Sequence, residues 1–85
     1  MPYLIEFSRS AAKDFEKLRD KVLREKIALA LEELAANPLS GKPLQGELKG
    51  CYSYRIGDYQ VIYSFEPHAK TIGILKINHR KEVYR

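Results

Sequence analysis

The alternation of apolar and polar residues in the second half of the chain predicts a β-hairpin followed by a third strand. Period two runs through Cys51–Ile56 and again through Tyr59–Phe65, and Gly57-Asp58 separates the two runs. Two-residue links of this composition are typical hairpin turns. A short turn at 66–69 leads into a last strand over Lys70–Asn78. This half therefore predicts three antiparallel strands in succession.

The first half predicts one strand and two helices. The strand is Tyr3–Phe7, Ser8 or Ser10 can cap the first helix, and Asp20 can cap the second. Apolar residues recur at helical spacing, at Ala11, Ala12, Phe15 and Leu18 in the first helix and at Leu23, Ile27, Ala30, Leu31 and Leu34 in the second. Asn37-Pro38 ends the second helix, because a residue before proline disfavours helical geometry. The short link predicts an antiparallel helical hairpin.

Together these elements predict an α+β fold of order β-α-α-β-β-β. The N-terminal helical hairpin packs on one face of a four-stranded, mainly antiparallel sheet. Residues 37–50 contain Pro, Gly and Lys without a period, and we expect a connector over the sheet edge that is long enough to carry a function. A chain of 85 residues predicts a single domain, 1–85.

The two-residue turn also predicts which side chains share a face of the sheet. It places Arg55 opposite Gln60, and directly paired residues point to the same side. The face toward the helices is then Tyr52, Tyr54, Ile56, Tyr59, Val61, Tyr63 and Phe65, and the open face carries Ser53, Arg55, Gln60 and Ser64. The tyrosines are therefore interpreted as packing groups.

On the last strand, alternation separates one set of side chains from the other. Leu75 and Ile77 suit the core, so their set, Gly73, Leu75, Ile77 and His79, is expected to face the helices. The other set, expected on the open face, is Ile72, Ile74, Lys76, Asn78 and Arg80. The result is a polar, cationic face built by Arg55, Gln60, Lys76 and Arg80 and flanked by His79 and Tyr84.

The charge distribution favours a polyanionic partner for the second half. The net charge is +4, and residues 1–40 contribute seven Lys/Arg against seven Asp/Glu, whereas residues 41–85 contribute eight against four. The single cysteine, Cys51, excludes an internal disulfide and fits a reducing cytosol. No membrane-length apolar run or signal peptide is visible, so a cytoplasmic protein is expected. His and Cys residues lack metal-ligand spacing, and no metal or cofactor is expected.

The hairpin and the C-terminal segment resemble the RelE/ParE toxin superfamily. An arginine precedes a glycine-containing turn in Tyr52-Ser53-Tyr54-Arg55-Ile56-Gly57-Asp58, and Tyr59-Gln60-Val61-Ile62-Tyr63 follows. The chain ends Ile77-Asn78-His79-Arg80-Lys81-Glu82-Val83-Tyr84-Arg85, which is similar to the family's terminal His-Arg-x-x-x-Tyr-like tail. The resemblance covers essentially the whole chain.

This resemblance implies the toxin of a type II toxin–antitoxin pair. RelE-like members enter the ribosomal A site and cut the bound mRNA by attack of a 2′-hydroxyl on the adjacent phosphate, without metal. The implied partners are a cognate antitoxin, the ribosome and mRNA, with operator DNA reached only through the antitoxin complex. A ParE-like DNA gyrase inhibitor and a non-catalytic antitoxin-binding relative are the alternatives.

The resemblance also assigns residues. Arg55 matches a basic position used for phosphate contact, Arg80 matches the arginine of the C-terminal segment, and Tyr84 matches the C-terminal tyrosine near the nucleophile. By side-chain chemistry, both arginines suit stabilisation of the phosphorane charge, and His79 is a candidate for proton transfer near neutrality. The candidate RNA-binding residues are Lys49, Ser53, Gln60, Lys76 and Lys81. Gln60 stands where RelE-type toxins usually have arginine, and Ser53 stands where the best-known RelE subtype has lysine. Both departures remove positive charge from the site.

Overall fold

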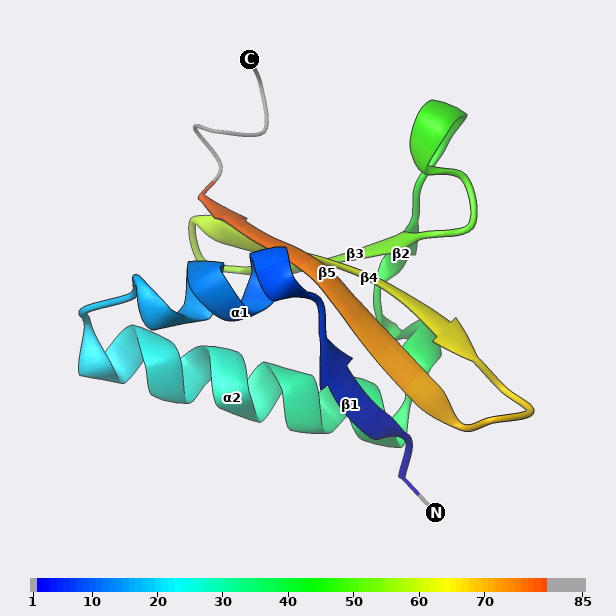
Figure 1. The fold of residues 1–85 in the computed structure, drawn as a ribbon, viewed down its shortest axis with the longest axis horizontal. Helices are drawn as coiled ribbons and strands as arrows, with labels where there is room; N and C mark the ends of the chain where they lie inside the picture. The colour runs from blue at the N-terminus through cyan, green and yellow to red at the C-terminus, as the bar shows by residue number, and fades with distance from the viewer. Residues whose placement is uncertain (1, 80–85) are drawn as a thin grey trace.

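The computed structural model describes residues 2–79 and has the predicted α+β architecture, with two helices on one side of a twisted sheet (Figure 1). The elements in chain order are β1 (Leu4–Phe7), α1 (Arg9–Glu16), α2 (Lys21–Ala36), the 3-10 helix η1 (Pro38–Ser40), β2 (Lys42–Pro43), the 3-10 helix η2 (Gly46–Leu48), β3 (Tyr52–Ile56), β4 (Tyr59–Glu66) and β5 (Thr71–His79). No helix within residues 2–79 is long and apolar enough to cross a bilayer.

The sheet has five strands rather than the predicted four, in the order β1-β5-β4-β3-β2. β1 is parallel to β5, and the other neighbours are antiparallel. The additional strand is β2, which lies in the segment predicted to be a connector, between η1 and η2. A two-residue strand that contains a proline has no alternation to detect, and β2 forms because β3 offers it a free edge.

Both helices begin at a side chain that accepts hydrogen bonds from exposed backbone amides. Ser8 Oγ accepts from Ala11 N at 2.9 Å, which identifies Ser8 rather than Ser10 as the cap of α1. Asp20 Oδ1 accepts from Val22 N at 2.9 Å and from Leu23 N at 3.3 Å, as predicted for the start of α2. These caps satisfy amides that have no partner inside the helix.

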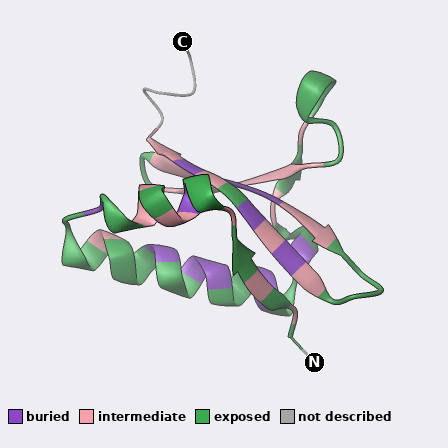
Figure 2. Cartoon of the chain, in the orientation of Figure 1, coloured by how far each residue is buried: buried purple, intermediate pink, exposed green. Residues whose placement is uncertain are grey.

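The core lies between α2, α1 and the sheet. Figure 2 shows buried residues along the side of α2 that faces the sheet and along β5. The largest fully buried side chains are Tyr63, Ile27, Leu34, Ile72, Ile74 and Val61. Tyr52, Tyr54 and Tyr59 pack against this cluster, so the prediction that the hairpin tyrosines are packing groups is confirmed.

The register predicted for the hairpin is confirmed, and the face predicted for half of β5 is wrong. Arg55 pairs with Gln60 as expected. Between β4 and β5, however, Ile62 pairs with Lys76 while Tyr63 pairs with Ile74, so Leu75 is an extra residue in a bulge.

The bulge reverses the alternation along β5. Lys76 and Asn78 lie on the open face as predicted, but Ile72 and Ile74 are fully buried on the helix side, and Leu75 is 38% exposed. An inserted residue changes the side-chain phase by one position. Here it allows the isoleucines on both sides of Leu75 to reach the core.

Candidate functional site

A pocket of about 300 Å³ opens where β2, β3 and β4 lie side by side. Its lining consists of Ser40, Gly41, Lys42, Ser53, Tyr54, Arg55, Tyr59 and Gln60. Three of the predicted site residues, Ser53, Arg55 and Gln60, therefore come together, with Lys42 added from β2. We call this the open-face pocket.

The strand ladder explains why these side chains converge. Lys42 pairs with Ser53, and Arg55 pairs with Gln60, so all four point to the same face. Gln60 Nε2 donates to Ser53 Oγ at 2.6 Å, which fixes the two neutral side chains against each other. Arg55 and Lys42 are exposed at the rim.

The charge of the open-face pocket is entirely positive among the described residues. Its lining contains Lys42 and Arg55 and no carboxylate. Neither cation has an acidic partner within 4.0 Å in residues 2–79. Unneutralised cations beside hydroxyl and amide donors form a surface that attracts phosphate groups.

Lys42 was missed by the sequence analysis. Its neighbours contain Pro and Gly and show no alternation, so the segment predicted a loop. Only an indirect indication in the sequence linked Lys42 to the site. Lys42 is a cation in the segment that leads into the strand with the candidate residues Ser53 and Arg55. Only the pairing of β2 with β3 places it beside Ser53.

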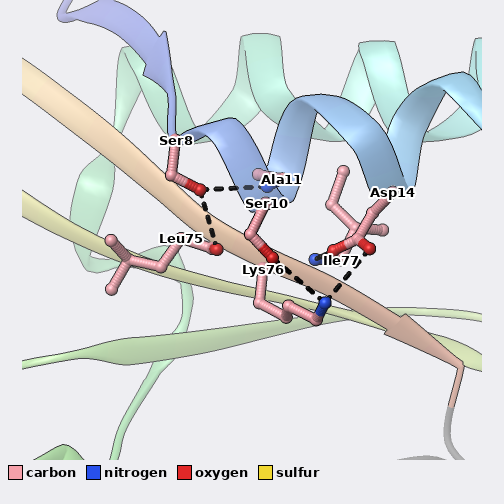
Figure 3. Close-up of polar contacts among 7 residues, drawn as sticks. All are labelled: Ser8, Ser10, Ala11, Asp14, Leu75, Lys76 and Ile77. Atoms are coloured by element: carbon pink, nitrogen blue, oxygen red, sulfur yellow. Dashed lines mark hydrogen bonds and ion pairs between the residues drawn. The ribbon is translucent and has the colours of Figure 1, made fainter.

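Lys76 lies on the same face but is held at its far edge. The Lys76 ammonium donates to Asp14 Oδ1 at 3.2 Å and to Ser10 Oγ at 3.1 Å, both on α1 (Figure 3). Ser8 Oγ also donates to the Leu75 carbonyl at 2.9 Å, which fixes the start of α1 to the bulge. Lys76 is therefore tied to the helix, unlike Lys42 and Arg55.

The remaining predicted residues lie elsewhere. His79 pairs with Tyr59, and both lie on the face opposite Arg55. Their rings pack edge to face, with the ring centroids 5.0 Å apart. Lys49 is exposed at the end of η2, in the link that projects beyond the sheet (Figure 1), and does not line the open-face pocket. Arg80, Lys81 and Tyr84 lie outside the described residues.

The buried side chain of Tyr63 fixes the backbone at Gly41, one of the residues that line the open-face pocket. Tyr63 Oη donates to the Pro38 carbonyl at 2.6 Å and accepts from Gly41 N at 3.0 Å. Burial is the main cause that raises the pKa of the Tyr63 hydroxyl above 10.0, so it stays protonated at neutral pH. Burial, with the nearby Glu33 carboxylate, likewise raises the pKa of Tyr54.

Residues 2–79 contain no group of three His, Cys, Asp or Glu side chains that could hold a metal ion. The described lining of the open-face pocket offers cations, hydroxyls and an amide. These groups can bind and orient a phosphodiester and stabilise additional negative charge on it.

Comparison with known proteins identifies the family. Residues 5–84 match the profile described as ParE toxin of type II toxin-antitoxin system, parDE. The chain belongs to this family and is a toxin of the RelE/ParE superfamily. It is 37% identical to Toxin RelG of Mycobacterium tuberculosis over 86 residues, which covers 100% of this chain and 99% of that protein.

Two further similarities support membership in the family. This ParE-family chain is 33% identical to Toxin RelE of Mycobacterium tuberculosis over 85 residues, covering 99% of the chain and 88% of that protein. Its fold matches a chain in the crystal structure of the toxin–antitoxin complex RelBE2 from the same organism, with a TM-score of 0.83, 36% identity, and coverage of 94% and 100%. The predicted resemblance is thus confirmed.

Proposed function

We propose that this toxin is a ribosome-dependent endoribonuclease that cleaves mRNA in the A site through attack of a 2′-hydroxyl on the adjacent phosphate, without a metal ion. The observation that carries the proposal is the open-face pocket, whose described lining has two cations and no carboxylate. The 33% identity to a protein named Toxin RelE supports the same assignment.

Arg55 has the role of binding the scissile phosphate. As the 2′-oxygen attacks, negative charge accumulates on the phosphorane oxygens, and a guanidinium can donate to two of them while remaining charged. The exposed position of Arg55 at the pocket rim allows an RNA backbone to approach it. Ser53 and Gln60, already joined by a hydrogen bond, orient the neighbouring backbone.

Proton transfer is assigned to the C-terminal segment. The 2′-hydroxyl must lose a proton and the departing 5′-oxygen must gain one. Tyr84 is proposed for proton transfer, Arg80 for stabilising the phosphorane charge together with Arg55, and Lys81 as a further RNA contact; all three follow the described residues. His79 keeps its proposed role only if the RNA passes around the end of β5, because its paired position puts it on the opposite face from Arg55.

Two other proposed RNA contacts lie at the margins of the open face. Lys49 extends the cationic surface from η2, and Lys76 extends it along β5, where its salt bridge to Asp14 must break or share the ammonium with a phosphate.

A gyrase inhibitor is the second candidate function. Gln60 favours it, since RelE-type toxins usually have arginine at this position, and Ser53 stands where the best-known RelE subtype has lysine. A non-catalytic relative that binds only its antitoxin would have the same feature. The cations Lys42 and Arg55, with no carboxylate in the described lining, favour the nuclease, because such a surface suits the phosphodiester backbone of RNA.

An antitoxin is the proposed protein partner. The similar Mycobacterium tuberculosis chain was crystallised as part of a toxin–antitoxin complex. We expect a cognate antitoxin to cover the open-face pocket with acidic or hydroxyl side chains, and to provide any contact with operator DNA. Dependence on the ribosome places the activity in the cytoplasm.

The deciding experiment is primer extension on mRNA held in programmed ribosomes, with purified toxin added. Cuts within the A-site codon that are absent without ribosomes, with 2′,3′-cyclic phosphate ends, would support the proposal. Arg55→Gln and Arg80→Ala should each slow cleavage at least tenfold, whereas Lys26→Gln, the same charge change on the exposed side of α2, should not. No cuts by folded, antitoxin-free protein, together with inhibition of DNA gyrase, would establish the second candidate instead.

A further inference from the structure

Lys42 is placed as a second cation beside Arg55. It lies directly across the ladder from Ser53, and Arg55 is two residues along the same strand and on the same face. Diagonal positions of this kind lie roughly 7–8 Å apart across a sheet. This is the separation of the two residue positions, and the long, flexible side chains of Lys42 and Arg55 allow their charged groups to reach two consecutive phosphates of a single nucleic-acid strand.

No acidic side chain within residues 2–79 neutralises the Lys42 ammonium. The open-face pocket has no carboxylate in its described lining, and Lys42 has no acidic partner within residues 2–79. Two exposed like charges on one face repel each other in the free protein, and phosphates bound to each of them reduce that repulsion. Lys76 provides the contrast, because it is on the same face but already paired with Asp14.

The backbone next to Lys42 is held from behind by Tyr63. The fully buried Tyr63 hydroxyl bonds both Gly41 N and the Pro38 carbonyl, and so fixes the chain that enters β2. Gly41 is required there, because a Cβ would lie 2.4 Å from Tyr63 Oη and 2.8 Å from the Ser53 carbonyl oxygen. A two-residue strand has little pairing of its own, so these contacts determine where Lys42 is presented.

We propose that Lys42 binds the RNA phosphate next to the one bound by Arg55, and that the Tyr63 hydroxyl is its positioning group. This inference rests on the proposed function for its ligand class, a single-stranded RNA backbone. It assigns to the connector between α2 and β3 a direct part in substrate binding.

The test is the salt dependence of binding to a short single-stranded RNA with 2′-O-methyl ribose, which cannot be cleaved. Loss of one phosphate contact lowers the slope of log affinity against log salt by about 0.7 for a single strand. Lys42→Gln should show that decrease and bind about tenfold more weakly, while Lys42→Arg should bind like the wild type. Lys26→Gln is the matched control and should change neither slope nor affinity.

The outcomes separate this inference from the proposed function. If Lys42→Gln has the same slope as Lys26→Gln, or if the wild-type protein does not bind the RNA, the role of Lys42 is overturned. A wild-type protein that cleaves A-site codons would still keep the proposed function. If cleavage is absent but the slope falls in Lys42→Gln, the phosphate contact holds and the nuclease proposal fails.

The positioning role of Tyr63 has its own measurement. Tyr63→Phe should weaken RNA binding when it is introduced into the wild-type protein. It should have no further effect when it is introduced into Lys42→Gln, because the Tyr63 hydroxyl acts only through the Lys42 ammonium. Equal effects in both backgrounds would reduce Tyr63 to a general structural role. In the unaltered protein, hydrogen exchange at Gly41 N should be slow, and rapid exchange would also contradict the assignment.

Discussion

Replacing Asp14 with alanine should weaken the attachment of α1 to the sheet. β1 pairs with β5 only as far as Ile74, so beyond that residue no strand within residues 2–79 continues along this edge of β5. The Asp14 carboxylate binds this edge through two hydrogen bonds. Oδ2 accepts from Ile77 N at 3.0 Å, and Oδ1 accepts from the Lys76 ammonium at 3.2 Å (Figure 3). Asp14→Ala removes both acceptors at once.

The two interactions differ in size. The Lys76 side chain is 44% exposed, so solvent screening reduces its salt bridge to about 0.5 kcal/mol. The Ile77 amide is partly buried, and leaving it without an acceptor costs about 1–2 kcal/mol. The expected loss in the free energy of unfolding is about 2 kcal/mol, which corresponds to a fall in Tm of about 10 °C for a domain of this length.

Urea unfolding of three variants distinguishes these contributions. Asp14→Asn keeps an oxygen acceptor for Ile77 N and loses only the charge, so it should cost about 0.5 kcal/mol. Lys76→Gln should cost about as much as Asp14→Asn. If Asp14→Asn is as damaging as Asp14→Ala, the salt bridge dominates and the reasoning from the backbone amide is wrong. A loss below 0.5 kcal/mol for Asp14→Ala would show that α1 is not anchored here.

Three further predictions concern the open-face pocket and its support. Gln60→Arg restores a cation beside Arg55 and should raise the rate of A-site cleavage several-fold in primer extension; an unchanged rate would exclude position 60 from the site. Gly41→Ala forces β2 away from the Ser53 carbonyl and should lower the free energy of unfolding, measured in urea, by about 2 kcal/mol, whereas Gly46→Ala, where the Cβ meets open space, should cost less than half as much despite its positive φ. The raised pKa of Tyr63 stabilises the folded state fully below pH about 10, and this contribution is lost as the pH rises through the folded-state pKa; Tyr63→Phe should therefore show a shallower alkaline decline in stability, with the contribution of Tyr54 retained, and an equally steep decline would refute the assignment.

Much of the fold and part of the site could be predicted because the signals were local. Ser8 and Asp20 cap helices through contacts within three residues, and alternation across Gly57-Asp58 determines the pairing of β3 with β4. That pairing alone brings Ser53, Arg55 and Gln60 to one face, and these are the predicted site residues that line the open-face pocket.

The bulge at Leu75 could not be predicted from alternation. From Ile72 to Ile77, apolar residues stand at both even and odd positions. The sequence is therefore compatible with either set of alternating residues facing the helices. The buried faces of α1 and α2 decide between them, because Ile72, Ile74 and Ile77 all reach the helices only if one residue is inserted. The cost of a bulge is offset by burial of three isoleucines.

The sequence by itself therefore determined the two helices and the four longer strands, their order, the hairpin register and the shared face of Ser53, Arg55 and Gln60, because each depends on residues a few positions apart. The tertiary structure alone decided the parallel pairing of β1 with β5, the phase of β5 and the addition of β2. These depend on edges and faces supplied by distant segments. Lys42 joins Arg55 for that reason: a strand of two residues exists only where β3 and the Tyr63 hydroxyl hold it.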